Sequence, residues 1–542
     1  MTGATLRDRH AVFAIVGGWA KGVHMSGHRR HAWLLAGVAG SLLAFVGVTA
    51  PAGAATSSAA ATYVVVLHGN GTAGLAAIEQ AGGRVLQMNK LGIAQVSSAN
   101  PSFLSAIRGS GGVDAAADDA SWHLGQKDVV SVTYVPATTQ AADCATFYHV
   151  PVNVGPEPLS ACEWDDRIIN ASPGQSYAVN QGAGATIGDM DTGIDLTHPD
   201  IAPNLDVGLS CSFITSANPN ANPAEVANGD CSNKAAVQDL NGHGTHTASE
   251  AASPINGIGT AGVAPKATIV ALKAGNAEGF FFTQEVTDAM IYAGDHHIDV
   301  VNMSFFADPW LFNCKNDADQ RAIVMAISRA SRYAQQHGVV MVAAEGNEAI
   351  DLAHPVTDTI SPDFPPGSEL TRDVGNNCVV LPNELPGVVG VTGIGPSGVL
   401  SFFSSYGAGV ADVTAPSGSS GQAPNPFGRV LAAWSSTAPP VGIAGRDVKD
   451  ASGAVYAWVQ GTSMASPHAA GVAALIRAAH PNMPPGAVEA ILQNTAMPKD
   501  CPTPAEMDPL SGALGVQTCS GGPGYTNFYG KGLVDALVAG SA

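Results

Sequence analysis

Basic residues are scarce in this sequence. Its 542 residues include 24 lysines and arginines against 44 aspartates and glutamates, so the formal net charge at pH 7 is −20. Nucleic acids and anionic membranes are bound by clustered lysine and arginine side chains. The charge balance therefore argues against both as partners, and its simplest role is to keep an exported protein soluble.

Charged residues are few overall, at 13%, whereas 46% of the residues are hydrophobic. This balance argues against a disordered chain and favours globular structure. The length is sufficient for two or three domains and for a large hydrophobic core.

Cysteine is absent from the first 143 residues, and no two cysteines have the C-x-x-C spacing of a metal knuckle. An even number in an exported chain predicts disulfides, although sequence alone permits on the order of 100 pairings of eight cysteines. We predict that nearest neighbours pair, with free core thiols as the alternative. The predicted pairs are Cys144–Cys162, Cys211–Cys231, Cys314–Cys378 and Cys501–Cys519.

The N-terminal segment has the features of an export signal. Arg29 and Arg30 precede an apolar run, 33–50, and the small residues of 51–54 resemble a cleavage site. We therefore assign residues 1–54 to a signal peptide and expect a secreted protein without membrane attachment once mature. The paired arginines are compatible with Tat or Sec export, and Met25 is an alternative start.

Residues 55–137 form a separate unit without cysteine. Apolar runs and short helical segments alternate in the β-α-β-β-α-β order of a ferredoxin-like α+β fold, and no catalytic pattern stands out in it. Its position between a signal and a larger domain predicts a propeptide. The expected strands are 63–67, 84–88, 92–97 and 129–135, and the expected helices are 73–82 and 101–108.

From residue 138 to 542, short apolar runs alternate with helical stretches. Continuous apolar runs are typical of parallel strands that are buried on both faces. The sequence therefore predicts an α/β fold, a three-layer α/β/α domain with a mostly parallel sheet. The clearest expected strands are 185–190, 268–272, 300–303, 338–344 and 388–391.

Three polar motifs stand at the ends of such runs. Asp191 lies in GDMDTGID after a strand, His243 lies in NGHGTH at a helix start, and Ser463 lies in GTSMASPH at another helix start. A serine hydroxyl needs a base to become a nucleophile, and histidine has a suitable pKa. A buried carboxylate then orients the imidazole. Because parallel strands end at one edge of a sheet, we predict that these side chains meet there.

Each motif alone has another interpretation. The DTG sequence also occurs in aspartic proteases, but these need a second such motif, and this chain has none. His243 and His246 suggest a metal pair, but the glutamate and spacing of H-E-x-x-H are absent. The serine motif resembles the nucleophile elbow of α/β-hydrolases, in which serine precedes the acid and histidine. The order here is aspartate, histidine, serine.

Taken together, the motifs resemble the subtilisin (subtilase) family over roughly 160–542. Further matches are GVAP at 262–265, VNMS at 301–304, SFFSSYG at 401–407, DVTAP at 412–416 and YGKGLV at 529–534. The resemblance implies a Ser-His-Asp serine endopeptidase in which Asp191, His243 and Ser463 form the triad. It assigns no catalytic role to Asp189, Asp195, His246 or Ser466.

The resemblance also identifies the side-chain amide of Asn347 as an oxyanion donor, with the Ser463 N–H as the second donor. A turn residue is the alternative interpretation of Asn347. The substrate-binding residues that it implies are Ser304, Phe305, Phe306, Ala344, Glu345 and Gly346. Two of these depart from the family, because Phe306 stands where glycine is usual and Glu345 replaces a small apolar residue. Residues 279–282 are either a further apolar subsite wall or inward-packed loop residues.

A structural calcium ion is expected from the same resemblance, because Asp200 and Asn256 match a family Ca²⁺ site. Oxygen ligands suit Ca²⁺, and a turn held by Asn256 is the alternative; catalysis itself needs no cofactor. By resemblance, 55–137 is an inhibitory propeptide removed by self-cleavage, predicted at 136–143, and 138–542 is the peptidase domain. We expect a monomer that acts on proteins or peptides.

Overall fold

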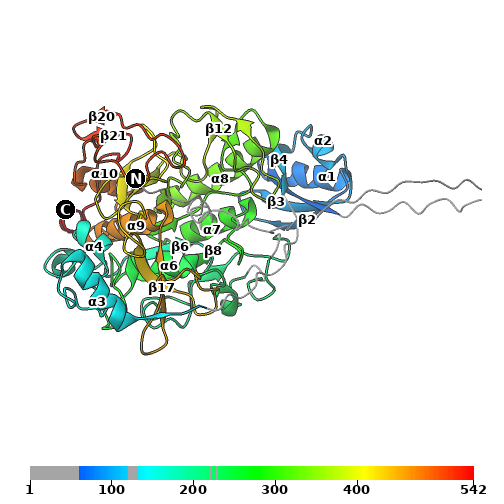
Figure 1. The fold of residues 1–542 in the computed structure, drawn as a ribbon. Helices are drawn as coiled ribbons and strands as arrows, with labels where there is room; N and C mark the ends of the chain where they lie inside the picture. The colour runs from blue at the N-terminus through cyan, green and yellow to red at the C-terminus, as the bar shows by residue number, and fades with distance from the viewer. Residues whose placement is uncertain (1–59, 120–131, 219–220, 228–229) are drawn as a thin grey trace, which may run out of the picture.

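The protein was analysed as a computed structural model that describes residues 60–119, 132–218, 221–227 and 230–542. The predicted signal segment 1–54 lies outside the described residues. Residues 60–119 form a small N-terminal domain, drawn in blue in Figure 1, and residues from 132 onward form a larger main domain.

The N-terminal domain has the predicted β-α-β-β-α-β order. Its antiparallel sheet has the strand order β2-β3-β1-β4, and two helices cover one face. The elements are β1 (Ala61–Leu67), α1 (Thr72–Gln80), β2 (Gly83–Met88), β3 (Ile93–Ser98), α2 (Phe103–Ile107) and β4 (Val113–Asp119).

The closing strand of this domain corrects the sequence prediction. It is β4, not 129–135, of which 129–131 lie outside the described residues. Alanine has low strand propensity, so the run Ala115–Ala117 does not predict a strand. Pairing with β1 and burial of these alanines between neighbouring elements stabilise it. Val135 belongs instead to β5 (Val135–Pro136), which pairs in parallel with β18 (Asp447–Lys449) of the main domain.

The main domain is built on a seven-stranded sheet in which every pair of neighbours is parallel. All five strands predicted from sequence are present. In spatial order the strands are β16 (Val413–Pro416), β15 (Val388–Ile394), β11 (Val340–Ala344), β9 (Val300–Met303), β6 (Thr186–Met190), β8 (Thr268–Lys273) and β7 (Cys211–Ser212).

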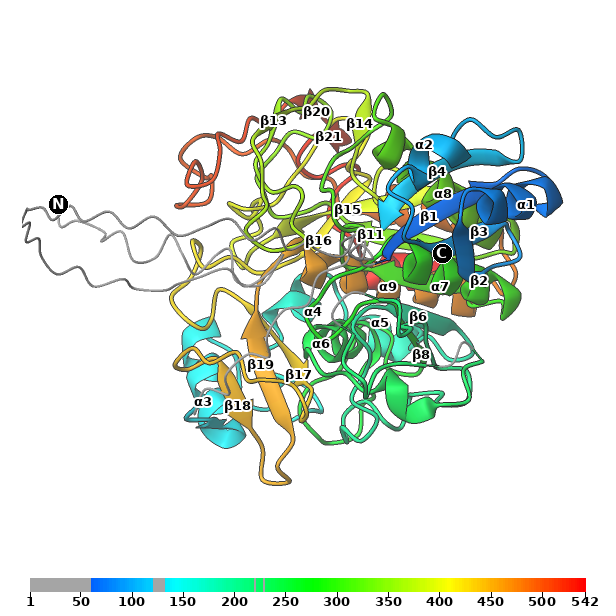
Figure 2. The same ribbon diagram turned by 90° about the vertical axis from the view of Figure 1, so that its right-hand side faces the viewer.

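Helices cover both faces of this sheet. Helices α6 (His243–Ala252) and α9 (Thr462–Ala479) lie on one face, and α7 (Thr283–Asp295) and α8 (Ala318–Gln336) lie on the other (Figures 1 and 2). Successive strand residues enter opposite cores: Val300 packs with α9, and Val301 packs with α7 and α8. The three-layer α/β/α architecture is therefore confirmed.

Smaller elements surround this core. An antiparallel group formed by β17, β19 and β18 lies beside α3 in Figure 2. The remaining elements are α3 (Ala137–Tyr148), α4 (Trp164–Ile168), α5 (Ser176–Val179), η2 (Lys234–Val237), β10 (Asn313–Cys314), β12 (Thr357–Asp358), β13 (Arg372–Asp373), β14 (Cys378–Val379), β17 (Val430–Trp434), β19 (Val455–Val459), α10 (Pro485–Thr495), β20 (Gly521–Gly522), β21 (Tyr525–Thr526) and α11 (Ala536–Ser541).

The sheet of the N-terminal domain packs on α7 and α8 (Figure 1). Apolar residues of β1, β3 and β4 share one buried cluster with these helices. Arg329 of α8 donates hydrogen bonds to the carbonyl oxygens of Leu67 (3.1 Å) and Leu91 (3.0 Å) and pairs with Asp114 at 2.8 Å. The apolar cluster, these two backbone hydrogen bonds and this ion pair thus hold the N-terminal domain on the helices.

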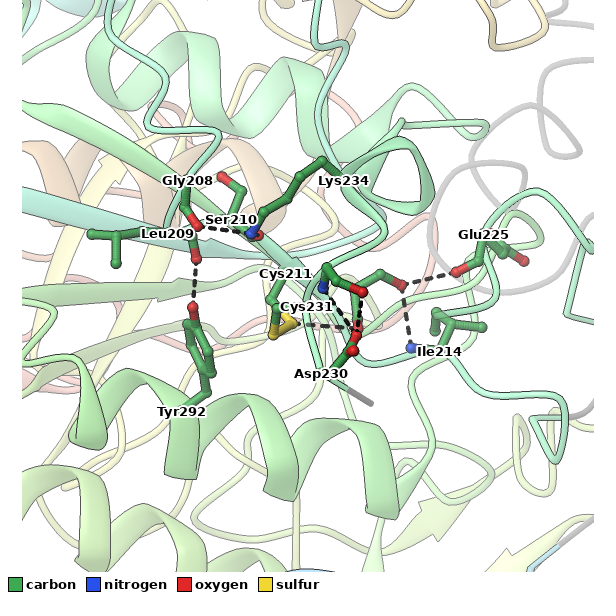
Figure 3. The surroundings of a disulfide bond; sticks show 12 residues. Gly208, Leu209, Ser210, Cys211, Ile214, Glu225, Asp230, Cys231, Lys234 and Tyr292 are labelled. Atoms are coloured by element: carbon green, nitrogen blue, oxygen red, sulfur yellow. Dashed lines mark hydrogen bonds between the residues drawn. A yellow bond between two sulfur atoms is a disulfide. The ribbon is translucent and has the colours of Figure 1, made fainter. Parts of the chain in front are cut away.

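All four predicted disulfides are present, and they close chain separations of 18, 20, 64 and 18 residues. Figure 3 shows the surroundings of the bridge between Cys211 and Cys231, which closes an excursion at the β7 edge of the sheet. Beside this bridge, Tyr292 of α7 donates to the carbonyl oxygen of Leu209 at 2.9 Å, so the excursion is also tied to the sheet's helical layer.

In the part of the chain that the structure describes, no helix combines the length and the apolar character needed to span a bilayer.

Candidate active site

Asp191 and His243 are in direct contact, although they are far apart in sequence. His243 Nδ1 lies 2.8 Å and 3.0 Å from the two carboxylate oxygens of Asp191. Asp191 follows β6, and His243 begins α6. Glycine makes the approach possible, because a Cβ atom at Gly244 would lie only 2.2 Å from the carbonyl oxygen of Gly193. The two motifs therefore form one acid–imidazole pair at the carboxyl edge of the sheet.

The electrostatics of this pair stabilise the imidazolium form of His243. Burial alone lowers the pKa of His243, but the Asp191 carboxylate outweighs burial and raises that pKa to about 9. Asp191 is fully buried, and the His243 side chain is 13% exposed. The imidazole therefore faces solvent on the side opposite its carboxylate partner.

Ser463 is the second residue of α9 and is buried with 6% exposure. Its hydroxyl donates to the carbonyl oxygen of Ser304 at 3.2 Å, and Ser304 Oγ in turn donates to the Ser463 carbonyl oxygen at 2.8 Å. Within the described residues, the Ser463 hydroxyl is hydrogen-bonded to Ser304 rather than to His243. Catalytic hydrogen bonds are often unformed without substrate, so attack requires this hydroxyl to turn toward the imidazole.

Asn347 lies next to the start of the same helix. Its Oδ1 accepts hydrogen bonds from the Thr462 N–H (2.7 Å) and the Thr462 hydroxyl (3.2 Å). These contacts fix the amide orientation and leave Nδ2 without a hydrogen-bond partner among the described residues. The Ser463 N–H, in the first turn of α9, is not used within the helix. Two N–H donors are therefore free near the Ser463 hydroxyl, as an oxyanion site requires.

The neighbouring polar residues of the three motifs form hydrogen bonds that stabilise the fold. Asp195 accepts from the Ser436 N–H at 2.8 Å, and the Ser466 hydroxyl donates to Asn302 Oδ1 at 2.6 Å. His246 is buried between Glu250 and the Ala457 carbonyl oxygen. Each of these side chains is engaged away from the acid–imidazole pair, as the resemblance implied.

The predicted substrate-binding residues divide into two groups. Ser304 and Gly346 lie beside Ser463, because Ser304 contacts it directly and the Gly346 N–H donates to Thr462 Oγ1 at 3.0 Å. Ala344 is the last residue of β11 and is 7% exposed. The Glu345 side chain instead points into the interior, where Asn383 Nδ2 donates to it at 3.0 Å. Burial raises its pKa well above the ordinary value. Its carboxyl group is therefore a structural group and does not line a pocket.

The phenylalanines around this edge pack against other apolar side chains, and Phe305 and Phe306 remain partly exposed. Phe305 stacks on Phe281 with 4.1 Å between ring centroids. Phe306 packs against the apolar cluster that includes the Cys314–Cys378 bridge. Phe280 and Phe282 contact Phe364 from the 348–378 excursion. The side chain at 306 thus fills space that this excursion creates, and residues 280–282 are inward-packed loop residues.

The predicted calcium ligands lie in neighbouring segments, because the Asn256 side chain donates to the Pro199 carbonyl oxygen, next to Asp200, at 3.3 Å. Asp200 is fully buried and accepts from the Thr260 N–H at 2.9 Å, whereas the Asn256 side chain is exposed and accepts from the Ile258 N–H at 2.8 Å. No group of three or more histidine, cysteine, aspartate or glutamate ligands occurs among the described residues. Asp200 Oδ1 and Glu157 Oε2 are nevertheless buried without a partner in the described part of the chain, so the Ca²⁺ site stays a prediction.

Removal of calcium tests the predicted site. Because a metal that binds only the folded state stabilises it, a bound Ca²⁺ makes the melting temperature sensitive to chelation. We expect the Tm of the protein to be lower in EDTA than in added CaCl₂, as measured by differential scanning fluorimetry, and we expect Asp200→Asn to abolish this difference. Equal Tm values in the two solutions would reject the site.

Sequence reasoning missed three residues that hold this edge together. Asp189 was considered only as a rejected triad member, and the roles of Asn302 and Thr462 were not recognised. The period of a strand was an available signal, since residues 189 and 191 share one face. The contacts of Asn302 and Thr462 join segments more than 100 residues apart, which no local pattern reveals.

Comparison with known proteins agrees with this geometry. A sequence profile of the Subtilase family, Peptidase_S8, matches residues 182–532, well over half of the chain. The protein therefore belongs to the subtilase family.

Individual relatives are distant. M-protease of Shouchella clausii (strain KSM-K16) is 27% identical over 358 residues, which cover 66% of this chain and 64% of that protein. Subtilisin BL of Lederbergia lenta is 27% identical over 358 residues, covering 66% of this chain and 91% of that protein. The chain thus spans less than two thirds of M-protease's length.

Solved structures support the fold. The epidermin leader peptide processing serine protease of Staphylococcus aureus has a TM-score of 0.61 and 20% identity, covering 90% of this chain and 99% of that one. Fervidolysin from Fervidobacterium pennivorans, a keratinolytic enzyme related to subtilisin, has a TM-score of 0.57 and 20% identity, covering 90% of this chain and 62% of that one. At this identity the likeness concerns the fold alone.

Proposed function

We propose that the protein is a secreted serine endopeptidase that hydrolyses peptide bonds through an acyl-enzyme and is made as a self-processed zymogen. The observation that carries this proposal is the contact of His243 Nδ1 with Asp191 at the edge where Ser463 begins α9. Family membership and the free N–H groups of Asn347 and Ser463 support it.

In the proposed mechanism, Ser463 Oγ attacks the peptide carbonyl carbon while His243 Nε2 takes its proton. Asp191 stabilises the imidazolium ion that forms. The negative charge on the carbonyl oxygen is met by Asn347 Nδ2 and the Ser463 N–H. His243 then protonates the leaving amine, and water, activated by the same imidazole, hydrolyses the acyl-enzyme.

The N-terminal domain is proposed to be the inhibitory propeptide. Its sheet packs on α7 and α8, and its last described residue, Asp119, is buried with 5% exposure. We place the cut before β5, not at the predicted 136–143. Residues from 137 onward form α3, in which Ala137, Gln140, Ala141 and Cys144 are buried. Proteases bind extended substrates, so cleavage inside α3 would first require unfolding it.

Propeptide release is expected to accelerate with rising pH. Glu285 of α7 is fully buried, and Asn218 is the side chain that bonds its carboxyl group. Burial, and then the nearby Asp119 of the propeptide, raises the pKa of Glu285 to about 8. A carboxyl group with a raised pKa favours the complex while it is protonated, and this contribution is lost as pH rises toward 8.

The rate of propeptide release can be measured as the lag that precedes peptidase activity. We expect Glu285→Gln to lengthen the lag several-fold at pH 8 but not at pH 5.5, because glutamine cannot ionise; the maximum for one proton is roughly tenfold per pH unit. Both proteins share the same triad, so the ratio of their lags isolates release from chemistry. Equal lags at both pH values would show that Glu285 does not govern release.

Hydrolysis of fluorescein-labelled casein by the processed protein tests the proposed function. Turnover together with N-terminal sequences of the products inside the casein chain would support an endopeptidase. A rival function is a catalytically inactive peptide-binding protein on a protease scaffold. Peptide binding without any cleavage, after the propeptide has been removed, would favour that rival.

A further inference from the structure

Asp189 is a buried acid that the proposed mechanism does not use. It is the fourth residue of β6, two positions before Asp191, and is 1% exposed. Because its side chain lies on the same strand face as Asp191, it points into the layer between the sheet and the helices that carry His243 and Ser463. It therefore occupies the space behind the triad.

Two elements contact this carboxyl group directly, and a third is reached through one of them. Asn302 of β9, its direct neighbour in the parallel register, donates from Nδ2 to Asp189 Oδ1 at 2.9 Å. Thr247 of α6 places Oγ1 at 3.0 Å from Asp189 Oδ2. Through Asn302, the network continues to α9, because the Ser466 hydroxyl donates to Asn302 Oδ1 at 2.6 Å.

The same network reaches Ser463. Asn302 Nδ2 also donates to Ser304 Oγ at 3.1 Å, and Ser304 is hydrogen-bonded to Ser463 in both directions. Asp189 thus connects the strand of Asp191, the helix of His243 and the helix of Ser463. We propose that Asp189 is a positioning residue, held in its neutral acid form, that fixes these three elements relative to one another. This inference rests on the proposed function.

The hydrogen-bond geometry accommodates the neutral form. Asp189 Oδ1 is used as an acceptor by Asn302. The Thr247 hydroxyl has one hydrogen, and the Gly244 carbonyl oxygen lies 3.2 Å away as an acceptor for it. When the Thr247 hydrogen points there, the Thr247 oxygen accepts the Asp189 O–H, so a neutral Asp189 keeps a partner for each of its oxygens.

Charge favours the neutral form as well. The charged groups that face Asp189 are Asp191, on its own strand, and His243, on α6. Burial, and then the negative charge of Asp191, raises the pKa of Asp189 well above its ordinary value. A second carboxylate here would hold His243 in its protonated form and so withhold the base from catalysis.

A pair of substitutions separates the neutral from the ionised form. Asp189→Asn keeps one acceptor and one donor in nearly the same shape, so it reproduces the neutral acid. We expect it to lower kcat by about fivefold or less. Asp189→Ala breaks the network, and because small displacements of catalytic groups are costly, we expect kcat to fall roughly 10–100-fold with little change in KM.

Asp299→Ala is the matched control. Asp299 accepts from the Thr186 N–H at 2.9 Å, so it joins the same two strands, β6 and β9, at their opposite ends. This variant is expected to lower the melting temperature without lowering kcat. If Asp189→Ala does not fold, Thr247→Val, which removes the acceptor for the Asp189 O–H, is expected to lower kcat in its place.

The pH profile of kcat/KM completes the test. Ionisation of Asp189 is expected to lower the activity of the wild type, and Asp189→Asn is expected to lack this loss while keeping the acid limb of His243. The inference is overturned if Asp189→Asn loses as much kcat as Asp189→Ala, or if Asp189→Ala and Thr247→Val both match the wild type. An inactive wild type would instead reject the proposed function.

Discussion

Ser463→Ala is expected to abolish peptide hydrolysis and to accumulate as an uncleaved precursor. The substitution removes the only atom that forms the acyl bond, and without it the contact of His243 with Asp191 has no proton to move. We expect kcat to fall by roughly 10⁶-fold, the size of loss known for the nucleophile of subtilisin. Turnover of labelled casein and the intact mass of the purified protein measure both effects.

Ser466→Ala is the matched control for this prediction. Ser466 lies one turn further along α9 and donates to Asn302, so its removal disturbs the framework but not the nucleophile. We expect at most about a tenfold loss of kcat, in line with the cost of slight misplacement. Normal processing of Ser463→Ala, or equal losses for the two variants, would mean that Ser463 is not the nucleophile.

Asn347→Ala is expected to have the second largest effect. The structure holds the amide through Oδ1 at Thr462 and leaves Nδ2 free, so the donor needs no reorganisation during attack. Its loss is expected to lower kcat by roughly 10²–10³-fold, as loss of the oxyanion amide does in subtilisin, with little change in KM. The negative charge on the carbonyl oxygen, which this amide stabilises, develops only after attack begins, so substrate binding is little affected.

Asn377→Ala provides the corresponding control, because the exposed side-chain amide of Asn377 bonds Asn316, away from the acid–imidazole pair. It is expected to leave kcat unchanged. A large rise in KM for Asn347→Ala, without a fall in kcat, would indicate that Asn347 binds the ground state and is not an oxyanion donor.

Much of the fold was predictable because a strand that is buried on both faces is a continuous apolar run in the sequence. The strand around Val300 and Val301 is apolar at every position, since helices cover both faces of the sheet. Strand β4 was missed because a run of alanines is not a recognisable strand pattern. Their burial depends on pairing with β1, which is distant in sequence.

The site divides in the same way. Asp191, His243 and Ser463 stand in motifs whose glycines and order are specific, so their joint position was predictable. The inward direction of Glu345 was not, because it depends on Asn383 and on a neighbouring strand. Similarly, the bonding of Asn256 Oδ1 to the Ile258 N–H and of Asp200 to the Thr260 N–H depends on how one loop folds, which residue types do not disclose.

Labelling with a fluorophosphonate, followed by peptide mapping, tests the central claim most directly. Such a reagent reacts with a serine only where a base and an oxyanion site activate it. The account predicts a single adduct on Ser463 of the processed protein, absent from Ser463→Ala and from His243→Ala. An adduct on another serine, or none on a processed and folded protein, would contradict it.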